Sequence, residues 1–126
     1  MTVGGPAERG SFEDEPAGTV ALDEVPEGVV LTVGGALDLA LAPTLRRTVE
    51  RAARLRPRLI VIDLTAVTFL ASSGMAELVR ARRQLRGEVG VRVVATGRLV
   101  LRPLQLTRLT DELDIHATLA DALARG

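Results

Sequence analysis

The chain has 126 residues, of which 47% are apolar, with no cysteine, two aromatic side chains and a formal net charge of zero. This length suits one domain of about 100–150 residues, and the absence of cysteine excludes disulfides and thiolate chemistry. A membrane-spanning helix needs roughly 18 consecutive apolar residues, which the chain lacks, and no basic-then-apolar leader opens it. We therefore expect a soluble cytoplasmic protein without a membrane partner.

The charges are unevenly distributed along the chain. Residues 1–28 contain seven acids and one arginine, so the remainder is positive overall. All sixteen basic residues are arginine, which we interpret as genomic composition bias. No arginine run is interleaved with aromatic residues, so the composition gives little support to direct nucleic-acid binding.

The N-terminal stretch 1–17 is rich in glycine, proline and acids and has no apolar periodicity. This composition predicts a disordered tail, followed by a folded domain over 18–126. Two strands are expected at 19–22 and 29–33, forming a hairpin around the turn-like sequence Pro26-Glu27-Gly28.

The next segment has the features of a helix after the hairpin. Gly34-Gly35 is expected to stop the second strand, and Asp38 precedes a helical pattern that contains Pro43 in its first turn and ends before Pro57. Its apolar positions recur at near-helical spacing and are Leu41, Leu45, Val49, Ala52 and Leu55.

The central stretch predicts a buried strand, a small-residue turn and a second helix. The run 59–62 is apolar and rich in β-branched residues, with Asp63 at its carboxyl end. The turn Ala71-Ser72-Ser73-Gly74 follows, and a helix is expected over 75–85. Both serines can cap that helix, and Phe69 is expected to be buried beneath the turn. The inward positions of the helix are Met75, Leu78, Val79 and Leu85.

Shorter elements follow to the C-terminus. A strand is expected around 91–94, a helical stretch over 99–109 interrupted at Pro103, an edge strand at 113–116, and a last helix capped by Thr118. The order predicts an α/β fold in which a mixed sheet of four to five strands packs against about four helices.

Residues 63–75 read D-L-T-A-V-T-F-L-A-S-S-G-M, which resembles the signature of the STAS domain in anti-sigma factor antagonists. The resemblance extends from about Gly28 to Leu123. It implies that the first serine, Ser72, is phosphorylated by a partner kinase that is itself the anti-sigma factor. Ser73 is the second-choice acceptor and the more favoured cap.

The same resemblance implies a partner-binding surface around the serines. Asp38 ends a Gly-Ala-Leu-Asp sequence similar to the family's G-E-L-D element, whose acid lies near the serine and contacts the kinase; a cap of the first helix is the alternative role. Ser72, Ser73, Gly74 and Met75 complete the predicted surface. Ala36 replaces the family's usual glutamate.

Catalytic interpretations find little support in the residues. Asp63 could suggest an aspartyl phosphoacceptor, but receiver domains need a helper lysine and the chain has none. His116 is the single histidine, so no transition-metal site is expected. A Ser-His-Asp triad lacks its G-x-S-x-G elbow, and no phosphate-binding loop occurs. We expect no catalytic residue, metal or cofactor, and therefore no enzyme.

The resemblance thus implies an anti-sigma factor antagonist that works by partner switching and regulates transcription. Its partner would be an anti-sigma factor serine kinase, and the chain would be a monomer or weak homodimer. Ala71 stands where the family often has aspartate. This departure leaves open a STAS module that is not phosphorylated and acts as a scaffold or ligand sensor.

Overall fold

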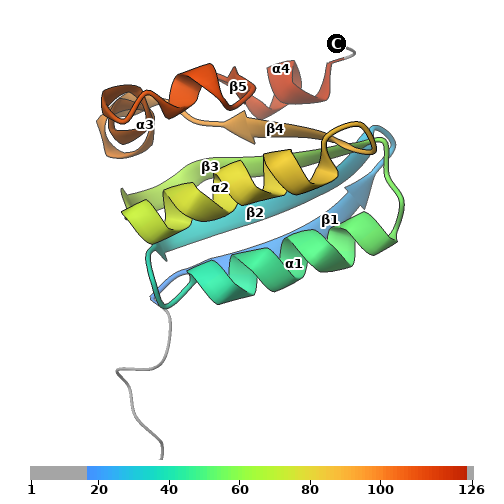
Figure 1. Cartoon of the computed structure of the whole chain (residues 1–126), viewed down its shortest axis with the longest axis horizontal. Coiled ribbons are helices and arrows are strands. Elements are labelled where there is room, and N and C mark those ends of the chain that lie inside the picture. The colour runs from blue at the N-terminus through green and yellow to red at the C-terminus, as the bar shows by residue number, and fades with distance from the viewer. Residues whose placement is uncertain (1–16, 125–126) are drawn as a thin grey trace, which may run out of the picture.

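The computed structural model describes residues 17–124, so the predicted tail lies almost wholly outside the described residues. The described chain forms an α/β fold with a five-stranded mixed sheet in the order β1-β2-β3-β4-β5 (Figure 1), as the sequence predicts. In chain order the elements are β1 (Thr19–Val25), β2 (Gly28–Leu37), α1 (Ala42–Arg54), β3 (Leu59–Leu70), α2 (Ser72–Leu85), β4 (Gly90–Val94), the π-helical turn η2 (Gly97–Leu101), α3 (Arg102–Leu106), the 3-10 turn η3 (Leu109–Asp111), β5 (Ile115–His116) and α4 (Leu119–Leu123).

The strand directions place one set of strand ends at a common edge. β1 and β2 form the predicted antiparallel hairpin, whereas β2, β3, β4 and β5 are parallel neighbours. The carboxyl ends of these parallel strands therefore meet at one edge of the sheet, which we call the carboxyl edge. In α/β sheets this edge commonly carries the functional residues.

Two predicted strand ends are wrong, and both errors have one cause. β2 passes through Gly34-Gly35 to Leu37, with register shifts between Thr32 and Gly34 and between Gly35 and Ala36. Gly35 has φ +75°, a conformation that glycine adopts without strain. At both shifts the extra residue lies in β3, and the glycines of β2 lie opposite these bulges instead of ending the strand. The bulges let β3 continue beside β2 as far as Leu70.

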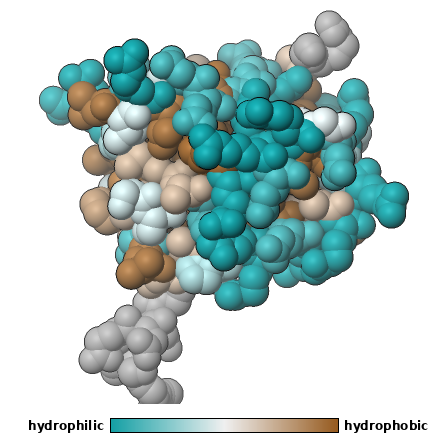
Figure 2. All heavy atoms as spheres, viewed as in Figure 1, coloured by the Kyte–Doolittle hydropathy of each residue, from teal (hydrophilic) through white to brown (hydrophobic). Residues whose placement is uncertain are grey.

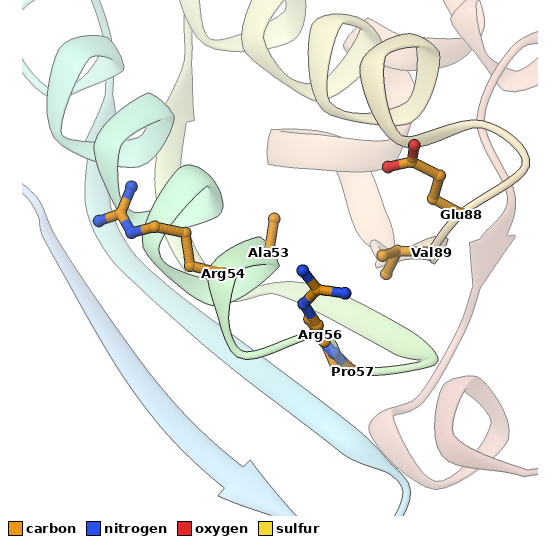
Figure 3. Close-up of a pocket in the computed structure, with 6 residues that line it drawn as sticks. All are labelled: Ala53, Arg54, Arg56, Pro57, Glu88 and Val89. Atoms are coloured by element: carbon orange, nitrogen blue, oxygen red, sulfur yellow. The ribbon is translucent and has the colours of Figure 1, made fainter.

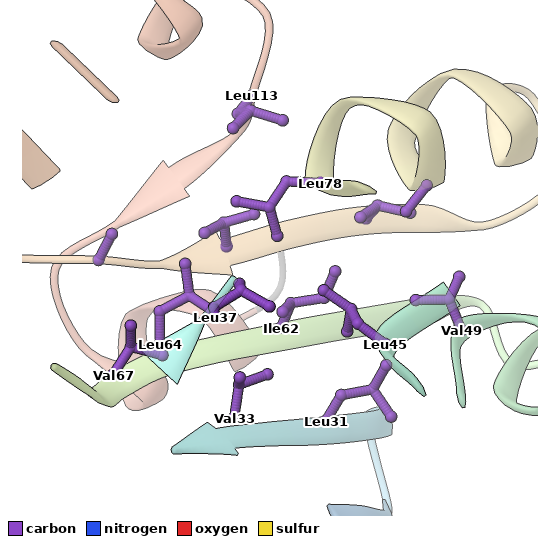
Figure 4. Close-up of a cluster of buried hydrophobic side chains, with 14 of the residues drawn as sticks. Leu31, Val33, Leu37, Leu45, Val49, Ile62, Leu64, Val67, Leu78 and Leu113 are labelled. Atoms are coloured by element: carbon purple, nitrogen blue, oxygen red, sulfur yellow. The ribbon is translucent and has the colours of Figure 1, made fainter. Parts of the chain in front are cut away.

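The main core lies between the sheet and the pair α1 and α2. Side chains from β2 and β3 meet those of the two helices there (Figure 4), including the fully buried Leu31, Leu45 and Leu78. Burying each such side chain contributes about 1.5–3 kcal/mol. Leu55, predicted to face inward, is exposed because α1 ends at Arg54 and Leu55 lies in the turn beyond it.

An ion pair connects the two helices of this layer. Glu77 of α2 is only 6% exposed, and its carboxylate accepts three hydrogen bonds from Arg46 of α1, the shortest 2.7 Å. Arg80 approaches the same carboxylate at 3.4 Å. The hydrogen bonds and charge of Glu77 raise the pKa of Arg46 above its usual value. No local sequence pattern marks Glu77 as the partner of Arg46.

The short helix α4 covers the other face of the sheet. Its Ala122 is buried with Val30, Val61 and Val94. Thr118 caps α4 as predicted, accepting a hydrogen bond from the Asp121 amide at 3.0 Å. At the other end, the Arg92 guanidinium of β4 donates to the carbonyls of Ala122 and Ala124 at 2.7 and 2.8 Å. Within residues 17–124, no helix combines the length and apolarity needed to cross a membrane.

Candidate functional site

The β3–α2 junction presents Ser72 to solvent at the carboxyl edge. Helix α2 begins at Ser72, three residues earlier than predicted, and its N-cap residue is Ala71. Ser72 and Ser73 therefore occupy the first two helical positions, and no side-chain hydrogen bond caps α2 among the described residues. The prediction that a serine caps the helix is wrong. Ser72 is exposed and Ser73 is half-buried, so Ser72 is the more accessible hydroxyl.

Asp38 is brought to the same edge by the pairing of β2 with β3. Leu37 pairs with Leu70, and the Ala71 amide donates to the Leu37 carbonyl at 2.9 Å. Asp38 directly follows β2 and Ser72 lies two residues after β3. The two residues therefore lie in neighbouring strand-to-helix connections. The Asp38 carboxylate accepts from the amides of Ala40 and Leu41 at 3.1 and 3.2 Å. It orders the turn before α1. The N-cap residue of α1 is Leu41, and no side-chain hydrogen bond caps this helix among the described residues, so the prediction that Asp38 caps it is wrong.

Gly74 and Met75 fix the start of α2 against the sheet. A Cβ at Gly74 would lie 2.5 Å from the Leu37 Cγ and 2.7 Å from its carbonyl oxygen, so only glycine allows this close approach. Gly74 is itself buried. Met75 is half-buried against the main core, and its sulfur lies 3.7 Å from the Thr107 hydroxyl oxygen. Their predicted partner contacts stay predictions.

A groove of about 590 Å³ runs from Ser72 along α2. It separates α2 from the segment that contains α3 and η3. Most of its exposed lining is apolar, and the residues that line it are Ser72, Met75, Ala76, Val79, Arg80, Arg83, Gln84, Thr107, Leu109 and Glu112. Sequence reasoning missed this groove because its two sides come from distant parts of the chain, and no local pattern indicates that they meet.

Exposed hydrophobic side chains gather at the carboxyl edge. Five large hydrophobic residues are exposed within residues 17–124, and all but Leu55 belong to segments at this edge. The four are Leu39, Phe69, Leu99 and Leu106. Figure 2 shows hydrophobic and near-neutral residues over the end of the molecule where α2 begins and α3 lies, whereas the opposite end is mostly hydrophilic. Such patches commonly mark interaction sites.

Phe69 contradicts the sequence prediction that it is buried. Its exposed fraction is 56%, while Val67 and Leu70 on the same strand are buried. The register shift leaves Thr68 as an extra residue of β3 between Val67, which pairs with Gly35, and Phe69, which pairs with Ala36. Leu70 therefore enters the core and Phe69 is directed outward. If inward and outward side chains are assumed to alternate without interruption from the buried run 59–62, the change of face before Phe69 is missed.

Asp63 and His116 lie away from Ser72. Asp63 is buried in the middle of β3, and its carboxylate accepts from the Thr65 amide at 3.0 Å; the prediction that it ends the strand is wrong. The seven residue steps from Asp63 to Leu70 span about 23 Å at the rise of a strand. His116 pairs in β5 across from Val94, which pairs with Asp63. These groups do not form a triad with Ser72.

A second cavity, of about 670 Å³, lies at the opposite edge of the sheet. Its walls come from the end of α1 and the turn between α2 and β4 (Figure 3), where Arg56 points into the opening and Arg54 points away. None of the predicted site residues lines it. Within the described part of the chain, no group of three histidine, aspartate or glutamate side chains could hold a metal ion.

Comparison with known proteins identifies the class to which this fold and this edge belong. The sequence model of the STAS domain family matches residues 19–122, and the chain belongs to that family. The anti-sigma-F factor antagonist RsfB of Mycobacterium tuberculosis is 36% identical over 94 residues, which cover 75% of this chain and 77% of RsfB.

Solved structures extend this similarity to three dimensions. An anti-sigma factor antagonist from Mycobacterium paratuberculosis is 34% identical, with a TM-score of 0.80 and coverage of 90% of this chain and 95% of that one. The phosphorylated form of SpoIIAA from Bacillus shares the fold at 21% identity, with a TM-score of 0.61 and coverage of 83% and 96%. The predicted STAS fold is thereby confirmed.

Proposed function

We propose that this protein is an anti-sigma factor antagonist that binds an anti-sigma factor kinase at the carboxyl edge and is controlled by phosphorylation of Ser72. The observation that carries the proposal is the exposed Ser72 hydroxyl at the first position of α2, beside the Asp38 turn and bordered by exposed Leu39 and Phe69. The similarity to mycobacterial antagonists supports it. The protein acts as ligand and substrate of its partner, in the cytoplasm, and so regulates transcription.

The geometry around Ser72 indicates how a phosphoryl group would act. It would add a charge of about −1.5 to −2 to an apolar surface. The start of α2 lacks a side-chain cap, and an anion there is stabilised by about 0.3–1 kcal/mol through the helix dipole. Phosphorylation would therefore leave the domain folded. In the complex, the desolvated charge would cost several kcal/mol, and each 1.4 kcal/mol lowers affinity about tenfold.

Ala71 favours a second candidate function. It occupies the N-cap position of α2, where the aspartate found in many relatives would supply a carboxylate. A STAS module that is not phosphorylated and binds a partner or a small ligand along the groove beside Ser72 is the alternative. The two candidates differ in whether Ser72 takes up phosphate.

The first prediction separates these candidates through three serine variants. Ser72→Ala should bind the kinase about as well as wild type, because a methyl group fits an apolar interface, and should take up no phosphate. Ser72→Asp should weaken binding by less than phosphorylation does, because it adds one charge. Binding is measured by calorimetric titration against the anti-sigma factor kinases of the same genome, and phosphate by intact mass after incubation with ATP.

Ser73→Ala is the matched control. Ser73 makes no capping bond, so this change should leave the thermal midpoint, the affinity and the phosphorylation close to those of wild type. Phosphate on Ser72→Ala, or equal affinity of Ser72→Asp and wild type, would contradict the assignment of Ser72. Wild-type binding without phosphate uptake would favour the scaffold function.

A further inference from the structure

The turn η2 and helix α3 form one short helical segment with a distinct outward face. Val100 and Leu104 point into the core. Facing away from them are the exposed side chains Arg98, Leu99, Arg102 and Leu106, followed by Arg108. Leu99 is 58% exposed and Leu106 is 66% exposed. We call these five residues the α3 face.

The α3 face carries positive charge that the described chain does not neutralise. The arginine ion pairs found within residues 17–124 involve Arg46, Arg80, Arg83 and Arg92. Two acids follow the face in sequence, Asp111 and Glu112, and Glu112 is engaged by Arg83. The α3 face thus has three arginines, and of the two acids that follow it only Asp111 forms no ion pair within the described chain.

The α3 face is continuous with the surface around Ser72. The Thr107 hydroxyl oxygen, between Leu106 and Arg108, lies 3.7 Å from the sulfur of Met75 near the start of α2. The groove that begins at Ser72 has α2 as one wall and the segment of Thr107 and Leu109 as the other. η2 also packs against β3, the strand that leads to Ser72. Figure 1 shows α3 at the end of the molecule where α2 begins.

We infer that the α3 face is a second part of the surface that binds the anti-sigma factor, and that it fits a partner patch of carboxylates around apolar recesses. This inference rests on the proposed function. Arginine forms bidentate hydrogen bonds with carboxylates, and charges at an interface accelerate association and set its salt dependence. The two exposed leucines supply the apolar contacts that charge alone does not give.

A matched pair of charge-reversal variants tests this inference in the full chain. The test variant combines Arg98→Glu, Arg102→Glu and Arg108→Glu. The control combines Arg54→Glu, Arg56→Glu and Arg58→Glu at the opposite edge. Each set changes the charge equally and includes one residue in the left-handed conformation, Arg108 with φ +63° or Arg56 with φ +55°. A milder set with glutamine at the test positions is used if melting shows that the glutamate variant is unfolded.

Affinity and association rate are measured by surface-binding titration against the anti-sigma factor kinase that binds wild type. The test variant should lose about 100-fold in affinity at low salt, mainly through slower association, and the difference should shrink at high salt. The affinity of the control should change by less than about threefold, because charges far from an interface act on it only through electrostatic fields that salt screens. Leu106→Ser should lose about tenfold, an intermediate loss for an interface residue, whereas exposed Leu55→Ser should not.

Each other outcome has a defined meaning. Equal effects of the two charge-reversal sets would overturn the inference while wild-type binding and the serine variants still support the function. Failure of every kinase to bind wild type would overturn the function and the inference with it. The competing occupant is residues 1–16, which carry four acids. If changing Glu8, Glu13, Asp14 and Glu15 to their amides abolished the arginine effect, that segment would be the occupant and the inference would be wrong.

Discussion

Leu64 and Phe69 lie on the same strand, five residues apart, in opposite environments. Leu64 is 0% exposed within the main core, whereas Phe69 is 56% exposed at the carboxyl edge. Phe69 is the larger side chain and one of only two aromatics in the chain. The free energy that each residue contributes to folding is set by how much of it leaves water, and Phe69 stays largely in water.

The second prediction compares these two residues directly. Leu64→Ala should lower the free energy of unfolding by about 2–5 kcal/mol, because it removes buried methyl groups and leaves a cavity. Phe69→Ala should cost less than about 1 kcal/mol, as is usual for exposed positions. Urea unfolding followed by circular dichroism measures both. A cost for Phe69→Ala equal to that of Leu64→Ala would show that Phe69 is buried in solution.

At the scale of elements, α1 and α2 are joined by an ion pair as well as by apolar packing. The Glu77 carboxylate is buried, but Arg46 is largely exposed. The two partners are therefore not equivalent. Removing Arg46 leaves a buried charge with Arg80 alone, whereas removing both Arg46 and Glu77 leaves no charge to solvate.

The third prediction uses this asymmetry. Arg46→Met should lower the thermal midpoint by several degrees, and the double variant Arg46→Met with Glu77→Leu should recover much of the loss. Arg47→Met is the control, since Arg47 donates a hydrogen bond to the Thr44 hydroxyl at 3.3 Å and forms no ion pair within residues 17–124. Surface arginines contribute little to stability. Equal losses for Arg46→Met and Arg47→Met would show that the ion pair does not stabilise the fold.

The elements that sequence predicted well are those with strong local periodicity. The hairpin, both long helices and Thr118 as a cap follow from spacing and capping chemistry. The course of β2 and β3 beyond Gly34 could not be predicted, because glycine is compatible both with a strand end and with a bulge. The choice depends on the neighbouring strand, which a single sequence does not reveal. The serines do not cap α2 because Ala71 occupies the N-cap position and both serines fall within the helix.

At the scale of the whole molecule, the seven acids and one arginine of the first 28 residues give a net charge of −6, and the remaining residues carry +6 because the chain is neutral overall. The described fold begins to pack at Gly18, where a Cβ would lie 2.6 Å from the carbonyl oxygens of Gly34 and Ala36. β1 starts at Thr19. Residues from Gly18 onward therefore belong to the packed domain.

The fourth prediction follows from this boundary. Deleting residues 1–16 should leave the thermal midpoint nearly unchanged, because that segment has no apolar periodicity with which to pack. Deleting residues 1–20 removes the start of β1 and should lower the midpoint clearly. Both are measured by thermal unfolding at equal ionic strength. A loss of more than about 2 kcal/mol on the shorter deletion would show that the segment docks on the domain.

Ser72 and Asp38 of the candidate site could be predicted from the sequence, whereas the groove and the α3 face could not. Ser72 and Asp38 carry a recognisable local sequence, and the parallel pairing of β2 and β3 brings their junctions together. The groove and the α3 face depend on how α3 folds back beside α2. That arrangement follows from burial of Val100 and Leu104, which no motif in the sequence specifies.

The absence of space beside Gly74 has a consequence for timing. The tight contact between Gly74 and Leu37 holds the start of α2 closely against the end of β2. A partner would meet the same backbone before and after phosphorylation of Ser72, and the difference would be the volume and charge of the phosphoryl group. No slow rearrangement would then delay recognition. We therefore expect phosphorylation to act mainly on the dissociation rate, which sets the lifetime of the complex.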